Sequence, residues 1–558
     1  MAYAEADAVP RPFFKKTERF QVPDKAYQER HQAYFDQEYH GTDGPLHTIY
    51  SKESAENNKY WHATLNNLGV DTNRSHLSGS NVGCWTSLAG VDPESQQRCY
   101  SARAYYLPAS ERKNLILLTK AMTREVVLEQ DGDEWVAKGV RFAHEGQEHV
   151  VRVKGEVILS CGSVQSPQIL ELSGVGNPEI LKAAGIEVKV ANNNVGENLQ
   201  EHMRESPVPP LLPLFEVLRQ LLVSMMIYEL DPSVLTPEAL RSDALMAAAA
   251  EEQYATSKSG PRTAVGYSAA YLPFSHFTPR EKLKSLASQL PTSNTRLRDQ
   301  ILLERFSSTD LPTGQVEFLF DVSNYSPFFQ SSPGKRYGTM MQMLQYPFSV
   351  GSIHIPPTKT SSSPPSTSDD KPIIDPRYFG GPGGEVDFQV MAAAQRFGHK
   401  ICSTPPLSSI IRERVFPAAT KKDTTTTAAV PLTNANHDTA NHLDSEVKED
   451  PEEDFSTWVR DSTITDWHPV GTCAMGGHEG IKGGVVDDRL CVYGVRGLRV
   501  CDASVMPLQI SAHLQATVYA IGEKGAAMVR EDWDGGDGRG VQGGNEQVNG
   551  AGAGVKGV

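Results

Sequence analysis

The sequence predicts two architectures in one chain, an α/β layer and a separate α+β unit with an antiparallel sheet. The α/β layer is predicted by an apolar strand over Glu156–Ser160, which turns through Cys161-Gly162-Ser163 into a helix from Pro167 to Leu172. The α+β unit is predicted by strand-like runs in the middle of the chain, which suit an antiparallel sheet with helices on one face. These runs are 316–320, 339–344 and 352–355.

The first third of the chain adds further strands to the α/β layer. A helical patch near 26–35 precedes a turn-rich connection. The apolar run 114–119 predicts a buried strand. The runs 126–129 and 135–142 predict a hairpin, because Asp131-Gly132-Asp133 lies between them.

The middle of the chain opens with helical periodicity over about 211–255. Its most apolar stretch, Leu211–Leu230, is interrupted by Glu216, Arg219 and Gln220. The sequence therefore predicts a buried or amphipathic helix there, and no membrane span.

Three segments lack the apolar content that offsets the entropy of ordering. Residues 356–371 are rich in Ser, Thr and Pro, residues 418–453 in Thr, Asn and acidic side chains, and residues 534–558 in Gly. All three are predicted to be disordered.

Composition is that of a protein with a sizeable core, since 39% of the 558 residues are hydrophobic and 22% are charged. The net charge of −15 argues against nucleic acid or an anionic membrane as the main partner. The seven cysteines are scattered and form no Cys-x-x-Cys, which argues against a disulfide scaffold or a zinc knuckle. We expect no metal site from this pattern.

Two histidines near the C-terminal end are the strongest candidates for chemistry. His468 lies in Trp467-His468-Pro469-Val470-Gly471-Thr472, and His513 lies in Ser511-Ala512-His513-Leu514-Gln515. Histidine can accept and return a proton near neutral pH, because its ordinary pKa is about 6.5. The two are far apart in the sequence, so only the fold could bring them together to abstract a proton.

A helix is predicted directly after His513. Leu514, Val518, Ile521 and Met528 give it an apolar face, and the positive charge of Arg530 lies at its C-terminal end. The free N–H groups of its first turn favour an anionic group beside His513. A strand over 498–500 precedes it.

Several of these motifs, in this order, resemble the glucose–methanol–choline (GMC) oxidoreductases, flavin enzymes that act on alcohols. The stretch Gly162 to Gly176 resembles the second signature of that family, and Val195–His202 resembles the segment that follows it. Residues 40–45, 98–115 and the C-terminal histidine block are similar as well. The resemblance runs from about residue 12 to about residue 530.

This resemblance implies FAD as cofactor and a small-molecule alcohol as substrate. His468 matches the catalytic base of the family, and His513 matches the second active-site position, which is His or Asn. A base within hydrogen-bond reach takes the hydroxyl proton, and the flavin takes the hydride. The family's contacts to FAD fall on Met122, Asp502, Ala503 and Gln515.

The family's dinucleotide motif is not found in residues 1–160. The match Gly538 to Gly543 follows no strand and precedes no helix, so we interpret it as chance. We therefore expect an incomplete FAD-binding α/β domain whose first βαβ unit is missing. The chain is then a fragment of a longer enzyme, a naturally shortened form, or one half of a two-chain enzyme, and we favour the first.

The resemblance also predicts how the chain is divided. Residues 1–205 form the FAD-binding domain with a lid segment, 206–455 the substrate-binding domain with the disordered inserts, and 456–533 the C-terminal part of the FAD domain. Three functions are open. The first is oxidation of an alcohol, with an aromatic alcohol or a secondary metabolite as candidate substrates. The others are a non-redox lyase or cyclase reaction on the same scaffold, and an inactive truncated homologue. Localisation and oligomeric state are not predicted.

Overall fold

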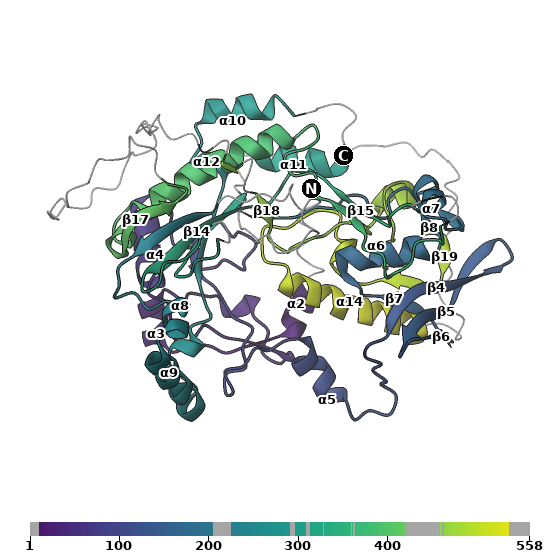
Figure 1. Ribbon diagram of the computed structural model, residues 1–558, viewed down its shortest axis with the longest axis horizontal. Helices are drawn as coiled ribbons and strands as arrows, with labels where there is room; N and C mark the ends of the chain where they lie inside the picture. Colours follow the sequence, from purple (N-terminus) through teal and green to yellow (C-terminus); the bar gives the residue numbers. More distant parts are fainter. Residues whose placement is uncertain are drawn as a thin grey trace, which may run out of the picture.

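The computed structural model describes 11–204, 225–290, 296–307, 313–326, 329–358, 360, 363–418, 455, 458–459 and 463–534 (Figure 1). One part is built around a large antiparallel sheet, with helix α12 lying across it on the left of the view. The other part, on the right, contains helices α6 and α14 and strands β4, β5 and β6. Each part has its own hydrophobic cluster.

The large sheet has eight strands and is antiparallel wherever its pairing is described. Its main path runs β17 (Ile411–Phe416), β11 (Met226–Leu230), β14 (Arg336–Leu344), β13 (Val316–Asp321), β12 (Ser268–Leu272) and β3 (Gly83–Thr86). The short strands β10 (Met203–Arg204) and β18 (Ile464–Thr465) extend it beside β14. The prediction of an antiparallel sheet in the middle of the chain is confirmed for the runs 316–320 and 339–344, whereas 352–354 forms a strand of a separate two-stranded sheet. Strand β3 joins the large sheet from the first third of the chain.

The two faces of this sheet differ in what covers them. Alternate residues of β13, such as Phe318, pack toward α12 (Gly384–Cys402), where the Phe318 and Phe397 rings are 5.4 Å apart. Glu317 and Leu319 point to the opposite face, which carries a second apolar cluster. That cluster consists of Met225, Ile227, Leu319, Tyr337, Met341 and Met343.

The described ranges contain several further helices. α4 (Asn58–Asn67) packs against β3 and β12, with Trp61 fully buried. The others are α3 (Lys25–His31), α5 (Leu107–Ala109), α8 (Pro237–Ser242), α9 (Ala244–Ser257), α10 (Arg280–Ala287) and α11 (Leu297–Ser307). Among the helices of the described ranges, none is both long and apolar enough to cross a membrane.

The α/β part joins segments from both ends of the chain. β7 (Val157–Leu159) pairs in parallel with β20 (Leu498–Val500). β4 (Met122–Asp131), β5 (Glu134–His144) and β6 (Gln147–Arg152) form an antiparallel sheet, which β19 (Val495–Arg496) joins in parallel with β5. The predicted hairpin is thus confirmed, and the α/β layer is present.

Smaller elements are β1 (Glu18–Phe20), β2 (Leu46–Thr48), β8 (Val175–Gly176), β9 (Val190–Ala191), α7 (Pro178–Ala183), β15 (Ser352–His354) and β16 (Ile373–Asp375).

Helix α6 (Gly162–Leu172) begins before Pro167, so the prediction that Pro167 lies in its first turn is wrong. A proline inside a helix cannot donate to the carbonyl four residues earlier, which here belongs to Ser163. The Thr472 hydroxyl donates to that carbonyl at 2.6 Å. Thr472, the last residue of the His468 motif, therefore satisfies a carbonyl of a helix that is distant in the sequence.

Helix α14 (Gln515–Asp534) confirms the predicted C-terminal helix. Leu514 and Met528 are buried, while Val518 and Ile521 are partly buried against the same clusters. Its outer side packs against α2 (Arg11–Thr17). Its first residue follows His513 closely, which places the helix N-terminus at the candidate site.

Two predicted elements are wrong. Residues 114–119 form no strand and are exposed, with Ile116 at 88%. A strand needs the edge of another strand, and the nearby hairpin starts only at Met122. Residues 226–230 form strand β11 and no helix, because a short apolar run fits either structure and here two strands pair with it. Residues 211–224 lie outside the described residues.

The three segments predicted to be disordered differ in outcome. Within 356–371, Thr358 and Ser366 donate backbone hydrogen bonds to the end of α7, and Ser366 and Ser368 are buried. This segment is therefore packed where the structure describes it, because backbone hydrogen bonds replace the apolar contacts it lacks. Residues 419–453 and 535–558 lie outside the described residues.

Candidate active site

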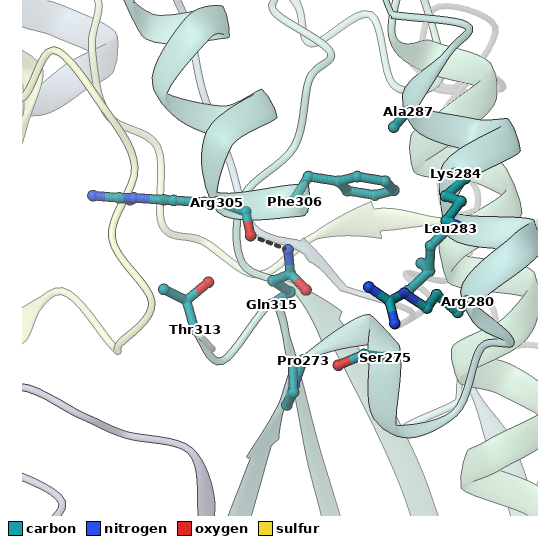
Figure 2. Close-up of a pocket in the computed structure, with 10 residues that line it drawn as sticks. All are labelled: Pro273, Ser275, Arg280, Leu283, Lys284, Ala287, Arg305, Phe306, Thr313 and Gln315. Carbon is teal, nitrogen blue, oxygen red and sulfur yellow. Dashed lines mark hydrogen bonds between the residues drawn. The ribbon is translucent and has the colours of Figure 1, made fainter. Parts of the chain in front are cut away.

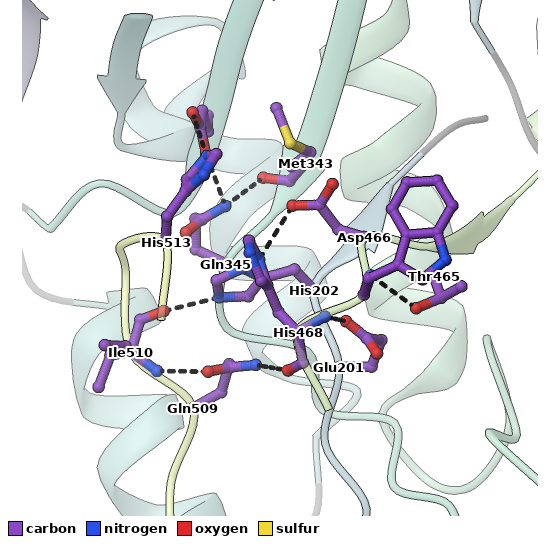
Figure 3. Close-up of polar contacts among 12 residues, drawn as sticks. Glu201, His202, Met343, Gln345, Thr465, Asp466, His468, Gln509, Ile510 and His513 are labelled. Atoms are coloured by element: carbon purple, nitrogen blue, oxygen red, sulfur yellow. Dashed lines mark hydrogen bonds and ion pairs between the residues drawn. The ribbon is translucent and has the colours of Figure 1, made fainter. Parts of the chain in front are cut away.

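The fold brings the two predicted histidines together. The His468 and His513 rings have centroids 5.0 Å apart and are inclined by 64° (Figure 3). His468 follows strand β18 at the edge of the large sheet, and His513 directly precedes α14. The site therefore lies where the antiparallel sheet meets the α/β part, as a pair of residues from distant segments requires.

A third histidine fixes the proton on the His468 ring. The His202 Nδ1 lies 3.0 Å from the His468 Nδ1, and the His202 Nε2 lies 2.7 Å from the carbonyl oxygen of Ile510. A carbonyl only accepts, so the His202 Nε2 carries a hydrogen and its Nδ1 is an acceptor in the neutral ring. The His468 Nδ1 must then be the donor.

Burial and a nearby carboxylate support this assignment. Burial lowers the pKa of His202 to about 3, so its ring is neutral at working pH. The Asp466 carboxylate also lies 3.0 Å from the His468 Nδ1 and favours a proton there. The remaining nitrogen of His468, Nε2, is thus the one that can accept a proton from a substrate.

Glu201 supports the backbone of this segment. Its Oε1 accepts a hydrogen bond from the His468 backbone N–H at 2.6 Å. Burial raises the pKa of Glu201 to about 8. The side chain is therefore protonated and neutral at pH 7, which avoids a second buried negative charge beside Asp466.

The stability of the protein should fall as the pH rises from about 6.5 to about 8, because of Glu201. The folded state holds the Glu201 proton up to a pKa of about 8, whereas the unfolded chain releases it near 4.5. His202 contributes no opposing slope here, because its loss of stability occurs only below about pH 6.5. The expected slope from Glu201 is about 1.4 kcal/mol per pH unit.

Denaturant unfolding of the wild type and of Glu201→Gln across this range measures that slope. The glutamine keeps the oxygen that accepts from His468 and cannot ionise, so its unfolding free energy should be flatter with pH. Equal slopes in the two proteins would show that Glu201 does not hold its proton in the folded state.

His513 is held by the large sheet. Its Nε2 lies 3.1 and 3.2 Å from the two oxygens of Glu317, which is fully buried in β13. The Tyr267 hydroxyl lies 3.4 Å from the His513 Nδ1. The carboxylate accepts from Nε2–H and orients the ring, and 39% of the His513 side chain is exposed. The ring is thus fixed and still accessible.

Gln509 ties the two histidine segments together. Its Nε2 donates to the carbonyl oxygen of His468 at 2.9 Å, and its Oε1 accepts from the Ile510 backbone N–H at 3.0 Å. Ile510 is the same residue whose carbonyl fixes His202. His468, His202 and the loop before His513 therefore form one hydrogen-bonded unit (Figure 3).

Asp502, predicted to contact the cofactor, turns its carboxylate into the protein. Oδ2 accepts from the Gly162 N–H at 2.9 Å and the Ser166 hydroxyl at 2.5 Å. Oδ1 accepts from the backbone N–H and the hydroxyl of Ser504 at 2.8 and 2.5 Å. The side chain joins the end of β20 to the start of α6, and contact with a cofactor remains a prediction for the main chain of Asp502 and Ala503.

Of the other two predicted cofactor residues, one lies beside the histidines and one lies in a different sheet. Gln515 is exposed at the first turn of α14, close to His513. Met122 is exposed at the start of β4, in the separate hairpin sheet opposite Ala143. The structure therefore groups Gln515 with the histidines and does not group Met122 with them.

The described residues fit the flavin end of FAD. Ser160 and Cys161 are exposed at the carboxyl end of β7, where parallel strands commonly present ligands. The N-terminus of α14 suits the negative charge of a reduced flavin beside His513. The described ranges contain no Gly-x-Gly-x-x-Gly, so a glycine-rich pyrophosphate cradle is not among them.

A pocket of the middle part lies apart from these residues. Figure 2 shows it between α10, α11 and the loop before β13, where the Gln315 Nε2 donates to the Arg305 carbonyl at 3.3 Å. It is lined by Pro273, Ser275, Arg280, Leu283, Lys284, Ala287, Arg305, Phe306, Thr313 and Gln315. None of these belongs to the histidine site, so we do not assign the reaction to this pocket.

Sequence reasoning identified His468 and His513 and missed their partners. His202 and Asp466 lie inside the motifs that carry the resemblance, yet their residue types alone did not show that they contact His468. Glu317 offered one signal, a charged residue in an otherwise apolar strand, which is costly unless it is paired. Tyr267 offered none.

The chain belongs to the GMC oxidoreductase family. The model of the family's N-terminal domain matches residues 11–204, and the model of its C-terminal domain matches residues 347–522. It is 30% identical to dehydrogenase mpl7 of Monascus purpureus, over 88% of this chain and 73% of that protein. It is 27% identical to an alcohol oxidase of Pichia angusta, over 93% of this chain and 77% of that protein. The predicted family is confirmed.

Solved structures show the same fold. An FAD-dependent oxidoreductase from Chaetomium thermophilum superposes with a TM-score of 0.73 at 20% identity, covering 94% of this chain and 80% of that one. A fungal aryl-alcohol oxidase gives a TM-score of 0.69 at 22% identity, covering 94% and 79%. Family membership and these neighbours support FAD as the cofactor.

Proposed function

We propose that the protein oxidises the CH–OH group of a small-molecule alcohol, with His468 as the base. The observation that carries this is the fixed tautomer of His468, whose Nδ1 donates to His202 and lies 3.0 Å from the Asp466 carboxylate. Nε2 then accepts the hydroxyl proton, and this step contributes about 10²–10⁴-fold to the rate. Bound FAD supplies the acceptor for the hydride that leaves the same carbon.

His513 orients the substrate oxygen in this proposal. Glu317 and Tyr267 fix its ring, and the 5.0 Å separation of the ring centroids keeps both rings within reach of one hydroxyl group beside them. Gln515 and the main chain of Asp502 and Ala503 hold the flavin end of the cofactor, and Met122 contacts the adenine end through its backbone.

The substrate is proposed to be an apolar alcohol, aryl or polyketide-like. The sheet face that carries Glu317 also carries an apolar cluster rich in methionine, including Met341 and Met343. Methionine is flexible and polarisable, so it accommodates flat, irregular ligands. Residues 1–205 and 456–533 form the cofactor side in this proposal, and residues 206–455 form the substrate side.

Anaerobic absorbance of the FAD-loaded protein tests the proposal. Adding benzyl alcohol should bleach the flavin band, and ethanol should bleach it more slowly because it leaves the apolar face unfilled. A bound flavin that no alcohol bleaches would support a non-redox lyase or cyclase reaction. A protein that takes up no FAD would support an inactive homologue.

A further inference from the structure

We propose that His202, Asp466 and His468 bind one divalent first-row transition metal ion, for which Zn²⁺ is the probe. We further propose that this ion blocks proton acceptance by His468. The binding site stands on geometry alone, and only the blocking effect rests on the proposed function.

The three side chains bring their ligand atoms close to one another. One nitrogen from each histidine and one carboxylate oxygen of Asp466 all lie within 4.8 Å of one another. The two nitrogens are 3.0 Å apart, and the His468 nitrogen is 3.0 Å from the oxygen. Ligands about 2.0–2.2 Å from one ion lie roughly 3 Å from each other, so two of the three separations already match a single ion, and binding draws the His202 nitrogen and the Asp466 oxygen together.

The hydrogen bond on the far side of His202 is of the kind that metal-binding histidines make. Histidines that bind metals commonly donate their other ring N–H to a carbonyl or carboxylate, which fixes the ring and its tautomer. The His202 Nε2 meets the Ile510 carbonyl at 2.7 Å in this way. The Nδ1 of this fully buried ring therefore has a free lone pair for binding once the His468 hydrogen no longer occupies it, and it faces the His468 Nδ1 at 3.0 Å.

The ligand set selects the kind of ion. Two imidazoles and one carboxylate suit Zn²⁺ and its first-row neighbours, whereas Mg²⁺ and Ca²⁺ prefer oxygen ligands. The side chain of His468 is 16% exposed and that of Asp466 only 3%, so the ion reaches the site from the His468 side. His202 and Asp466 are buried, and their environment limits competing water.

Binding at the His468 Nδ1 would change what Nε2 can do. The neutral ring has one hydrogen, which lies on Nδ1 without metal. When Nδ1 gives its lone pair to the ion, that hydrogen moves to Nε2, and no proton is lost or gained. Nε2–H cannot accept the substrate proton, so a metal-bound enzyme should not turn over.

Calorimetric titration of the full chain with ZnCl₂, with Co²⁺ absorbance as a second readout, tests the site. We expect one ion per chain, and at least tenfold weaker binding in His202→Asn and Asp466→Asn. His149→Gln is the matched control, because His149 is an exposed histidine on β6 with His144 nearby. MgCl₂ should give no binding.

Absent binding, or binding that survives both substitutions, would overturn the proposal. Two variants guard against one that fails to fold, which circular dichroism reports. Activity separates the two proposals: turnover without Zn²⁺ binding rejects only the metal site, and Zn²⁺ binding without any turnover rejects only the oxidation. Inhibition that EDTA reverses, in a protein that binds Zn²⁺, supports both.

Discussion

Replacing His468 with alanine should lower turnover by about 10²–10⁴-fold while FAD binding and thermal stability change little. The His468 and His513 rings are the two that face the proposed substrate position. His202 and Asp466 both lie at the Nδ1 of His468, so its Nε2 remains available to accept the hydroxyl proton. Its backbone is held separately, by Glu201 and Gln509, so the segment keeps its position without the imidazole.

Steady-state rates and the flavin absorbance of the purified variant provide the measurement. His478→Ala is the matched control, because His478 is exposed, lies on the same segment and contacts neither ring of the site. A variant that keeps full turnover would remove His468 from the role of base. A variant that loses FAD together with turnover would instead give His468 a part in holding the cofactor.

The local structure that sequence patterns predict well is the structure that local residues determine. The hairpin of β4 and β5 was predictable because Asp131-Gly132-Asp133 closes it within a few residues. The apolar runs 114–119 and 226–230 were not, since each takes its structure from distant partners. β14 and β17 pair with 226–230 and make it a strand, and 114–119 has no such partner within the described ranges.

The same distinction holds for the site. His468 and His513 were found because each lies in a short motif that resembles a family. The side chains around them come from distant parts of the sequence. Glu317, which contacts His513, lies in a strand of the middle unit, and His202, which contacts His468, ends an upstream motif. The fixed tautomer of His468 could not be predicted from sequence, because it depends on a backbone carbonyl, that of Ile510.

Replacing Asp502 with alanine should lower the free energy of unfolding by about 2–4 kcal/mol. Its two oxygens accept four hydrogen bonds, from Gly162, Ser166 and twice from Ser504. Alanine leaves the buried Ser166 and Ser504 hydroxyls and the partly buried Gly162 N–H without this acceptor, and it removes the side-chain link between the end of β20 and the start of α6. Ser504→Ala is the control, because it removes one of the four bonds and should cost about 1 kcal/mol.

The measurement that separates a structural role from a cofactor role is unfolding with and without FAD. A carboxylate that only ties two elements together contributes equally in both states, so Asp502→Ala should be destabilised by the same amount without FAD. A carboxylate that binds the cofactor would contribute only when FAD is present, and the FAD-free variant would then unfold like the wild type. We expect the first result, because all four contacts of the Asp502 side chain are made by the chain itself.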